Sequence, residues 1–228
     1  MIVSKTVIIT GAAGNLGRAV VSNFVDKDYH VIAADNVGGA VPKPDAHANF
    51  ETHEVNAMSE RDADNFVQSI ISKHGKIDAA CLLIGGFAMG SIENTGEDEL
   101  QKMFALNFNT LYFTARPIFN QMLKQNEGKL IFVGTVPALT DNAGYDMIAY
   151  TLSKSLVIKL AKILNSEGHK KNIQCSVIAP TTIDTPQNRA SMPNADFNKW
   201  TKAEEIATMM EFIISSKGDK MKGLIIKM

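Results

Sequence analysis

The chain has 228 residues, of which 45% are hydrophobic and 21% are charged, and its formal net charge is −1. This length and composition suit one soluble α/β domain, residues 1–228, with a large core. The small net charge and the lack of a long basic stripe exclude nucleic acid as an expected partner. No apolar run approaches membrane-spanning length and the first predicted strand starts early, so we expect neither a signal peptide nor a membrane partner.

Cysteine and histidine usage gives two further expectations. Cys81 and Cys175 each lie inside an apolar, strand-like run. A disulfide framework is therefore not expected, and a reduced, cytoplasmic location is the simplest interpretation. The five histidines, at positions 30, 47, 53, 74 and 169, show no paired-ligand spacing, so the sequence predicts no metal site.

Short apolar runs alternate with helical patterns along the whole chain. In chain order, strands are predicted at residues 5–10, 30–35, 49–55, 77–84, 129–134, 172–179 and 222–227. Helices are predicted at residues 15–27, 60–74, 97–124, 148–167 and 202–216. This alternation predicts a doubly wound α/β fold, with a mostly parallel seven-stranded sheet and helices on both of its faces.

Two of the predicted helices carry capping signals at their starts. Ser59 precedes two acidic residues at the start of the second helix. Thr201 and Glu204 show the pattern of a capping box at the start of the last helix. Both residues are therefore expected to cap the helices that follow them.

A glycine-rich turn joins the first predicted strand to the first predicted helix. The run from Gly11 to Gly17, with Gly14, Asn15 and Leu16 between them, follows the apolar strand at once. Glycines there allow a tight reversal and let backbone N–H groups approach a pyrophosphate, and the helix N-terminus adds a favourable dipole. The turn predicts a dinucleotide-binding site; a plain glycine-rich loop is the alternative.

Asp35 ends the second predicted strand, at the place where a ribose is bound in such sites. Its carboxylate can accept hydrogen bonds from the adenosine ribose hydroxyls and would repel a 2′-phosphate. No lysine or arginine follows it until Lys43. We therefore expect NAD(H) as the preferred cofactor, with NADP(H) as the second choice.

Tyr150 and Lys154 are four residues apart on a predicted helix, so their side chains should share one face. An adjacent ammonium favours the phenolate and lowers the pKa of the tyrosine. The pair could then act as a general acid or base near neutrality. The alternative is that both residues simply lie on an ordinary amphipathic helix.

Together these elements resemble the short-chain dehydrogenase/reductase family over essentially the whole chain. The matching positions keep the order and spacing of that family: Thr10-Gly-x-x-Gly-x-x-Gly17, Asp35, Asn107, Tyr150-x-x-x-Lys154 and Pro180-x-x-x-x-Thr185. The resemblance implies a single Rossmann-type domain that binds NAD(H) or NADP(H) and acts on a small molecule.

The resemblance also implies roles for individual residues. Tyr150 would exchange a proton with the substrate, and Lys154 would lower the pKa of that phenol and hold the nicotinamide ribose. Asn107 would support a proton-relay water. Family members commonly pair through the helices predicted at 97–124 and 148–167, so we expect a homodimer or a homotetramer. Further cofactor contacts are implied for Gly85, Gly86, Pro180, Ile183 and Thr185.

Two departures from the family pattern affect the expected site. Thr135 takes the place of the serine that normally polarises the substrate carbonyl; it keeps the hydroxyl but lies slightly further from Tyr150 than is usual. A β-branched core or strand residue is the alternative interpretation. At the end of the fourth strand, Leu82-Leu-Ile-Gly85 replaces the usual Asn-Asn-Ala-Gly.

One branch of the family resembles this chain in those departures. The Gly85-Gly86-Phe87 turn and the segment from Thr182 to Trp200 are similar to dihydropteridine reductases, which use NADH to reduce quinonoid dihydropterins. Residues 181–200 would form a lid over the substrate, a surface loop being the alternative. Phe87 would stack on a flat substrate ring or, alternatively, pack as core under the lid.

We therefore expect an NAD(P)H-dependent enzyme that passes hydride to a small C=O or C=N substrate, a quinonoid dihydropterin being the candidate that the resemblance favours. Two alternatives remain open. One is a carbonyl or 3-ketoacyl-type reductase, which the hydroxyl of Thr135 favours. The other is a non-enzymatic dinucleotide sensor, although the presence of Asn107, Tyr150 and Lys154 argues against mere binding.

Overall fold

The computed structural model describes residues 4–36, 38–39, 41, 49–141, 143–221, 223 and 225–228. Its main sheet has seven strands, all parallel, in the order β3-β2-β1-β4-β5-β6-β9, and β7 and β8 form a separate pair. The predicted doubly wound fold is confirmed. Of the last predicted strand, residues 222 and 224 lie outside the described residues. The strands are β1 Thr6–Thr10, β2 His30–Asp35, β3 Phe50–Glu54, β4 Ala79–Leu82, β5 Gly128–Val133, β6 Ile173–Ala179, β7 Ile183–Asp184, β8 Thr201–Lys202 and β9 Ile225–Lys227.

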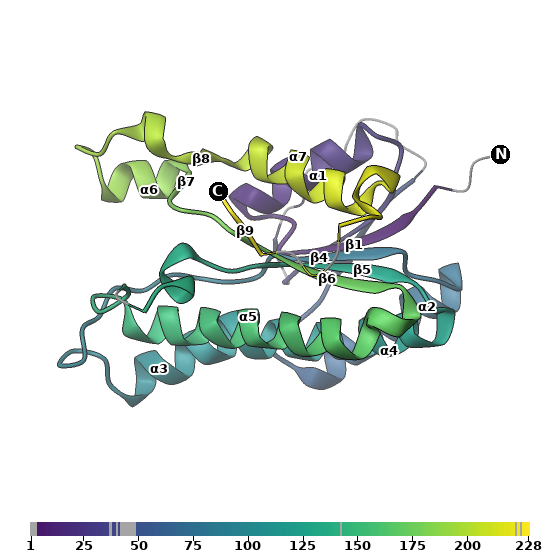
Figure 1. Ribbon diagram of the computed structural model, residues 1–228, viewed down its shortest axis with the longest axis horizontal. Helices are drawn as coiled ribbons and strands as arrows, with labels where there is room; N and C mark the ends of the chain where they lie inside the picture. The colour runs from purple at the N-terminus through teal and green to yellow at the C-terminus, as the bar shows by residue number, and fades with distance from the viewer. Residues whose placement is uncertain are drawn as a thin grey trace.

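Helices cover both faces of this sheet, which forms the middle layer of the molecule (Figure 1). The α-helices are α1 Asn15–Val25, α2 Glu60–His74, α3 Glu97–Phe104, α4 Thr110–Gln125, α5 Ile148–Gly168, α6 Pro186–Ser191 and α7 Ala203–Ile214. On one face lie α1 and α7, and on the other lie α2, α4 and α5. Among the helices of the described residues, none is long and apolar enough to cross a membrane.

Alternating strand residues fill two cores, one on each face of the sheet. Along β1, Val7 and Ile9 pack toward α1 and α7, whereas Ile8 packs toward the helices on the opposite face. All three side chains are fully buried, as expected for a parallel sheet that is covered on both faces. Burial of each such side chain stabilises the fold by about 1.5–3 kcal/mol. The strand ends that carry the functional residues are thus held in a rigid frame.

The structure confirms one predicted helix cap and corrects the other. Ser59 caps α2, because its hydroxyl oxygen accepts a hydrogen bond from the backbone N–H of the third helical residue at 3.3 Å. Thr201 does not form a capping box with Glu204, because β8 pairs Thr201 with β7. The first turn of α7 is closed instead by Glu205, whose carboxylate accepts a hydrogen bond from the backbone N–H of Lys202 at 3.1 Å.

The single helix predicted at residues 97–124 is interrupted in the structure. A π-helical turn, Ala105–Asn109, joins α3 to α4. Such turns are wider than α-helical ones and occur frequently at functional sites. Asn107 lies in the middle of this turn and is fully buried. The apolar periodicity of the segment continues through the π-helical turn, so the periodicity did not reveal that the helix widens there.

The segment after β6 is more ordered than the irregular stretch expected for residues 181–200. It contains β7, α6 and a 3₁₀ turn at Phe197–Lys199. Arg189 ties these pieces together, because its guanidinium donates to both carboxylate oxygens of Asp184 at 2.6 and 2.7 Å. The same guanidinium lies 4.6 Å from the ring centroid of Phe197, a cation–π contact.

Three of the five histidines lie close together, which corrects the expectation that they are scattered. Glu51 on the edge strand β3 lies among them, with Nε2 of His30 and of His74 at 3.0 and 3.1 Å from its Oε1. Nε2 of His53 lies 3.4 Å from Oε2 of the same carboxylate. The parallel register of β2 and β3 and the end of α2 bring these side chains together. The spacing of the histidines along the sequence does not show which residues of β2 and β3 lie side by side, so it could not predict this cluster.

Candidate active site

The turn after β1 admits only glycine at two of its positions. Gly11 has a φ of +68°, in the left-handed region that other residues rarely enter, and a Cβ on Gly17 would lie 2.0 Å from the carbonyl oxygen of Gly11. The helix α1 begins at Asn15, and its N-cap residue, Gly14, has no side chain to occupy the first N–H groups. Leu16 packs against the core and fixes the helix start. The first turn of α1 therefore suits an anion such as a pyrophosphate.

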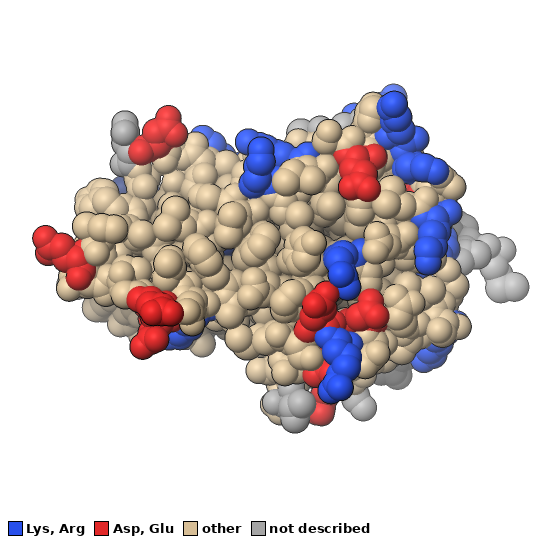
Figure 2. All heavy atoms as spheres, turned by 90° about the horizontal axis from the view of Figure 1, so that it is seen from below, with Lys and Arg blue, Asp and Glu red and all other residues tan. Residues whose placement is uncertain are grey.

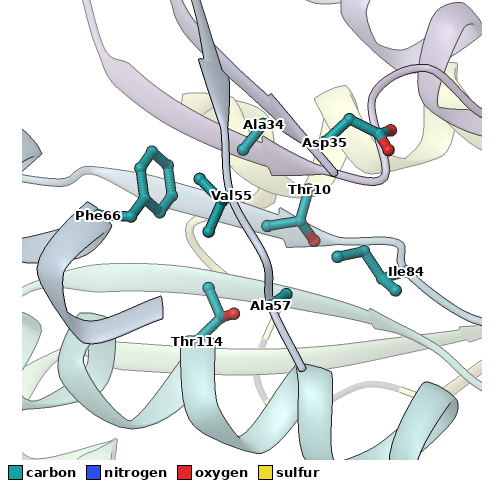
Figure 3. A pocket seen from close by; sticks show the side chains of 8 residues that line it. All are labelled: Thr10, Ala34, Asp35, Val55, Ala57, Phe66, Ile84 and Thr114. Atoms are coloured by element: carbon teal, nitrogen blue, oxygen red, sulfur yellow. The ribbon is translucent and has the colours of Figure 1, made fainter. Parts of the chain in front are cut away.

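Asp35 ends β2 beside this turn. Its Oδ2 accepts a hydrogen bond from the backbone N–H of Ala13 at 2.7 Å, and its Oδ1 accepts one from the N–H of Asn36 at 2.8 Å. The carboxylate borders a small, largely apolar hollow (Figure 3), lined by Thr10, Ala34, Asp35, Val55, Ala57, Phe66, Ile84 and Thr114. A carboxylate at this place can accept hydrogen bonds from the hydroxyls of a bound ribose.

The turn beyond β4 is held in place by Asn107. Its Oδ1 accepts a hydrogen bond from the N–H of Gly86 at 2.9 Å, and its Nδ2 donates to the Gly86 carbonyl at 3.1 Å. Nδ2 also donates to Oγ of Ser153 at 3.0 Å. A Cβ on Gly85 would lie 2.7 Å from Asn107 Oδ1 and 3.1 Å from Nζ of Lys154. Glycine at this position therefore lets the turn, the carboxamide and the lysine come together.

Tyr150 and Lys154 lie one turn apart on α5, as their spacing predicts. Lys154 is only 6% exposed, its Nζ donates to the carbonyl of Val133 at 2.9 Å, and burial lowers its pKa to about 8. Burial also raises the pKa of Tyr150, and a hydrogen bond with Thr135 offsets only part of that rise. The expected net lowering of the phenol pKa is thus not found, because desolvation dominates. The phenol keeps its proton at neutral pH.

Thr135 lies just beyond the last residue of β5 and is buried, with 6% of its surface exposed. Its hydroxyl lies close enough to the phenol of Tyr150 to offset part of the rise in the pKa of that phenol. Thr135 is therefore not a strand residue, but its burial agrees with a place in the core, so its catalytic role stays a prediction. That its hydroxyl replaces the serine of the family pattern likewise stays a prediction.

Phe87 follows the two glycines after β4 and contacts Tyr150. The two ring centroids are 5.0 Å apart and the ring planes cross at 73°, an edge-to-face contact. Phe87 is 57% exposed, so the interpretation that it packs as core is wrong. Its exposed ring surface beside a protonated phenol is available to a flat molecule.

The segment after β6 reaches the glycine turn from the other side. Pro180 is buried at the end of β6, and Ile183 lies in β7. Thr185 caps α6, with its Oγ1 accepting a hydrogen bond from the third residue of that helix at 3.2 Å. On α6, Oε1 of Gln187 accepts a hydrogen bond from Nδ2 of Asn15 at 2.7 Å. The proposed lid and the expected pyrophosphate site are therefore in direct contact.

One polar residue of this region, Ser153, was missed in the sequence analysis. Ser153 is fully buried, accepts from Asn107 and donates to the backbone carbonyl of Tyr150 at 2.7 Å. Its place within the tyrosine–lysine motif was the available signal. Thr10, at the end of β1, accepts a hydrogen bond from the N–H of Leu83 at 3.2 Å through its Oγ1 and so ties β1 to the end of β4.

The chain is similar to several known proteins over most of its length. A family model described as short chain dehydrogenase matches residues 5–196. The dihydropteridine reductase of Dictyostelium discoideum is 29% identical over 98% of this chain and 94% of its own length. The 3-oxoacyl-[acyl-carrier-protein] reductase FabG of Thermotoga maritima is 23% identical over 97% of this chain and 95% of its own. The solved structure of ElxO with NADP bound has a TM-score of 0.87 and 20% identity, covering 98% of this chain and 96% of that one.

The residues present fit a nicotinamide dinucleotide. The glycine turn leaves room that a Cβ would fill, the start of α1 offers N–H groups to a pyrophosphate, and Asp35 offers acceptors to a ribose. The matched family model spans most of the chain, and the seven-stranded parallel sheet agrees with it. This chain therefore belongs to the short-chain dehydrogenase/reductase family of NAD(P)-dependent oxidoreductases.

Proposed function

We propose that this enzyme uses NADH to reduce a small, flat C=N or C=O substrate, with a quinonoid dihydropterin as the best candidate. One observation carries the proposal: the exposed ring of Phe87 lies against Tyr150, whose raised pKa keeps its proton. A bicyclic ring stacked on Phe87 would lie within reach of that proton. Residues 181–200 would close over the ring and exclude water. The similarity to a dihydropteridine reductase over 98% of this chain supports the choice.

In this proposal each side chain around the substrate has a defined task. Hydride comes from the nicotinamide when the cofactor is bound. Tyr150 donates a proton to the substrate, and the hydrogen bond with Thr135 orients its phenol. Lys154, held by the carbonyl at the end of β5, binds the nicotinamide ribose. Asn107 fixes the position of Gly86 and supports a proton-relay water.

We assign the dinucleotide to the carboxyl ends of the central strands. The pyrophosphate would accept hydrogen bonds from the N–H groups at the start of α1, around Asn15 and Leu16. Asp35 would bind the adenosine ribose and, being a carboxylate, would disfavour a 2′-phosphate, so we propose a preference for NADH over NADPH. The nicotinamide half would lie among Gly85, Gly86, Pro180, Ile183 and Thr185.

A carbonyl or 3-ketoacyl-type reductase is the second candidate. The hydrogen bond between Thr135 and Tyr150 favours it, because a hydroxyl at that place can also donate to a carbonyl oxygen. The similarity to a 3-oxoacyl-[acyl-carrier-protein] reductase over 97% of this chain points the same way. The exposed ring of Phe87 distinguishes the two candidates, since a flat ring gains from stacking and an acyl chain does not.

We also propose that two copies of the chain pair through α4 and α5. Four large side chains on these helices are 37–49% exposed: Tyr112, Leu152, Leu156 and Ile163. Figure 2 shows the molecule from the side of these helices, and much of the centre of that face carries no charged residue. Pairing would bury these side chains in a four-helix arrangement. Light scattering at micromolar concentration should give the mass of a dimer or a tetramer, and a monomeric mass would contradict the pairing.

The substrate is tested by following NADH oxidation with quinonoid dihydropterin, simple ketones and a ketoacyl thioester. We expect the highest kcat/KM for the pterin. Phe87→Ala should raise the pterin KM about 2- to 12-fold, the equivalent of 0.5–1.5 kcal/mol of ring contact. Met89→Ala is the matched control, because Met89 is 60% exposed on the same loop and has no aromatic ring to stack on a substrate.

Each outcome of this experiment is informative. A higher kcat/KM for ketones or ketoacyl thioesters would overturn the pterin proposal and favour the second candidate. An equal effect of Phe87→Ala and Met89→Ala on KM would remove the stacking argument. Tight NADH binding without turnover of any of the three substrate classes would instead indicate a dinucleotide sensor.

A further inference from the structure

A cluster of titratable side chains lies near the amino ends of β2 and β3, at the edge of the sheet opposite to the glycine turn. Glu51 is at its centre, with Nε2 of His30 at 3.0 Å and Nε2 of His74 at 3.1 Å from the same oxygen, Oε1. The three potential ligand atoms all lie within 4.8 Å of one another. Three separate elements thus bring two imidazole nitrogens and one carboxylate oxygen together.

One ring nitrogen of His74 makes no hydrogen bond in the described part of the chain. Its Nε2 is shielded from solvent and has no hydrogen-bond partner within the described part of the chain. The nitrogen lies 3.1 Å from Oε1 of Glu51, but its direction does not suit a hydrogen bond. A buried polar atom without a partner destabilises the folded state. A metal ion bound by this ring nitrogen would remove that cost.

The separations in the cluster suit a small tetrahedral cation. Metal bonds of about 2.0–2.2 Å to nitrogen and oxygen place the ligand atoms of a tetrahedral site about 3.3–3.5 Å apart. The observed separations of 3.0 and 3.1 Å are a few tenths of an ångström shorter, so small side-chain movements would admit the ion. The side chains of His30, Glu51 and His74 are 14–20% exposed, which leaves access for the ion and for a water as fourth ligand.

The neighbouring charges do not block this arrangement. Nζ of Lys73 lies 2.8 Å from Oε2 of Glu51, and Nε2 of His53 lies 3.4 Å from that same atom. Both groups therefore contact the oxygen that the other two histidines do not. Lys73 would repel a dication, but its side chain is 60% exposed and solvent screens the repulsion.

We propose that His30, Glu51 and His74 form a binding site for a divalent transition-metal ion, with zinc as the best match. Two imidazoles and one carboxylate are a ligand set that zinc accepts readily, whereas magnesium and calcium prefer oxygen alone. The ion would join β2, the edge strand β3 and the end of α2. Because the active site lies at the opposite ends of the strands, the ion would stabilise the fold and take no part in the reaction.

Zinc chloride titrated into the metal-stripped full chain tests the proposal. We expect one ion per chain by calorimetry, and cobalt chloride should give the absorption spectrum of a tetrahedral site. Zinc at 100 times its Kd should raise Tm by about 5–10 °C. Glu51→Gln and His74→Gln should each weaken zinc affinity by about 100-fold and remove this rise. His169→Gln is the matched control, because that histidine is exposed and outside the cluster.

Two further measurements keep the result unambiguous. Lys73→Met should tighten zinc binding about threefold, because it removes a like charge near the ion. Where circular dichroism shows that Glu51→Gln or His74→Gln does not fold, His30→Gln takes its place. Zinc affinity that is equal in the unaltered chain and in the folded ligand variants would overturn the proposal. The absence of any calorimetric signal up to millimolar zinc would also overturn it.

Discussion

The carboxyl ends and the amino ends of the parallel strands carry two polar clusters that are assembled in different ways. At the carboxyl ends, the turn from Gly11 to Gly17 and the pair of Tyr150 and Lys154 each lie within a short run of sequence. At the amino ends, the His30–Glu51–His74 cluster draws one residue from each of three elements. The first cluster follows from local backbone geometry, and the second follows from the order of strands in the sheet.

This difference shows which kinds of functional site can be recognised from one sequence. A turn or one helical face brings nearby residues together wherever it occurs, so residue types and spacing are enough to recognise it. Side chains on neighbouring parallel strands meet only after the strand order is known. The difference also separates two kinds of effect: changes at the carboxyl ends should act on turnover and cofactor binding, and changes at the amino ends on stability and metal response.

The largest expected effect is the loss of turnover in Tyr150→Phe. General acid catalysis contributes about 10²–10⁴-fold, so kcat should fall by that factor while NADH affinity is retained. His74→Gln, at the opposite edge, should keep its kcat. Steady-state kinetics and NADH titration of both variants give the answer. Unchanged turnover in Tyr150→Phe, or an equal loss in His74→Gln, would contradict the expectation that only changes at the carboxyl ends of the strands affect turnover.

The buried ammonium of Lys154 should make stability depend on pH. Burial lowers its pKa to about 8, so between pH 8 and the ordinary value the unfolded chain holds a proton that the folded chain has released. Stability should therefore rise with pH across that window, by up to about 3 kcal/mol. In Lys154→Met this rise of stability with pH should disappear. In Lys159→Met it should remain, because Lys159 is exposed on the same helix. Urea unfolding of the cofactor-free chain at several pH values measures the difference; parallel curves for both variants would contradict it.

Gly17→Ala should destabilise the chain by about 2 kcal/mol, because its Cβ would lie 2.0 Å from the carbonyl oxygen of Gly11. Tm should fall by about 4–8 °C, and NADH affinity should fall with it. Gly96→Ala is the control, since a Cβ there meets nothing within 4 Å. Thermal unfolding compares the two. A Gly17→Ala variant as stable as Gly96→Ala would show that the turn tolerates a side chain.

The smallest expected effect concerns the choice of cofactor. A carboxylate beside a 2′-phosphate costs on the order of 1–4 kcal/mol at intermediate dielectric, so NADH should bind more tightly than NADPH. Asp35→Ser should narrow that gap by about tenfold. Glu54→Ser, which removes the same charge from the paired position on β3, should leave the gap unchanged. Calorimetric titration that shows tighter NADPH binding to the unaltered chain would refute the preference.

Much of the fold could be predicted because its signals are local. The apolar runs of a parallel sheet are nearly continuous, and the helices between them are amphipathic, so the seven strands and the sheet type followed from the pattern. Ser59 was recognised as a cap for the same reason, because its partner lies within one turn. The prediction that Thr201 caps the last helix was wrong, because Thr201 pairs with Ile183 of another strand and helix-capping patterns do not show such a pairing.

The parts of the site that could not be predicted depend on burial and on contacts between elements. An i, i+4 spacing places Lys154 beside Tyr150, but it does not show that both are buried, and burial reverses the expected direction of the phenol pKa. The exposure of Phe87 was likewise undecided, because a glycine-flanked aromatic can point inward or outward. The histidine cluster was missed because it needs the register of β2 and β3.

The two hydrogen bonds between Asn107 and Gly86 have a practical consequence for protein engineering. A carboxamide carries the same donor and acceptor as a peptide group, so the side chain pairs with Gly86 as an additional strand would, one step beyond β4. Aspartate lacks the donor and leucine lacks both groups. Libraries intended to change substrate range should therefore keep this anchor fixed and place their diversity at the exposed positions that follow it, Phe87 and Met89.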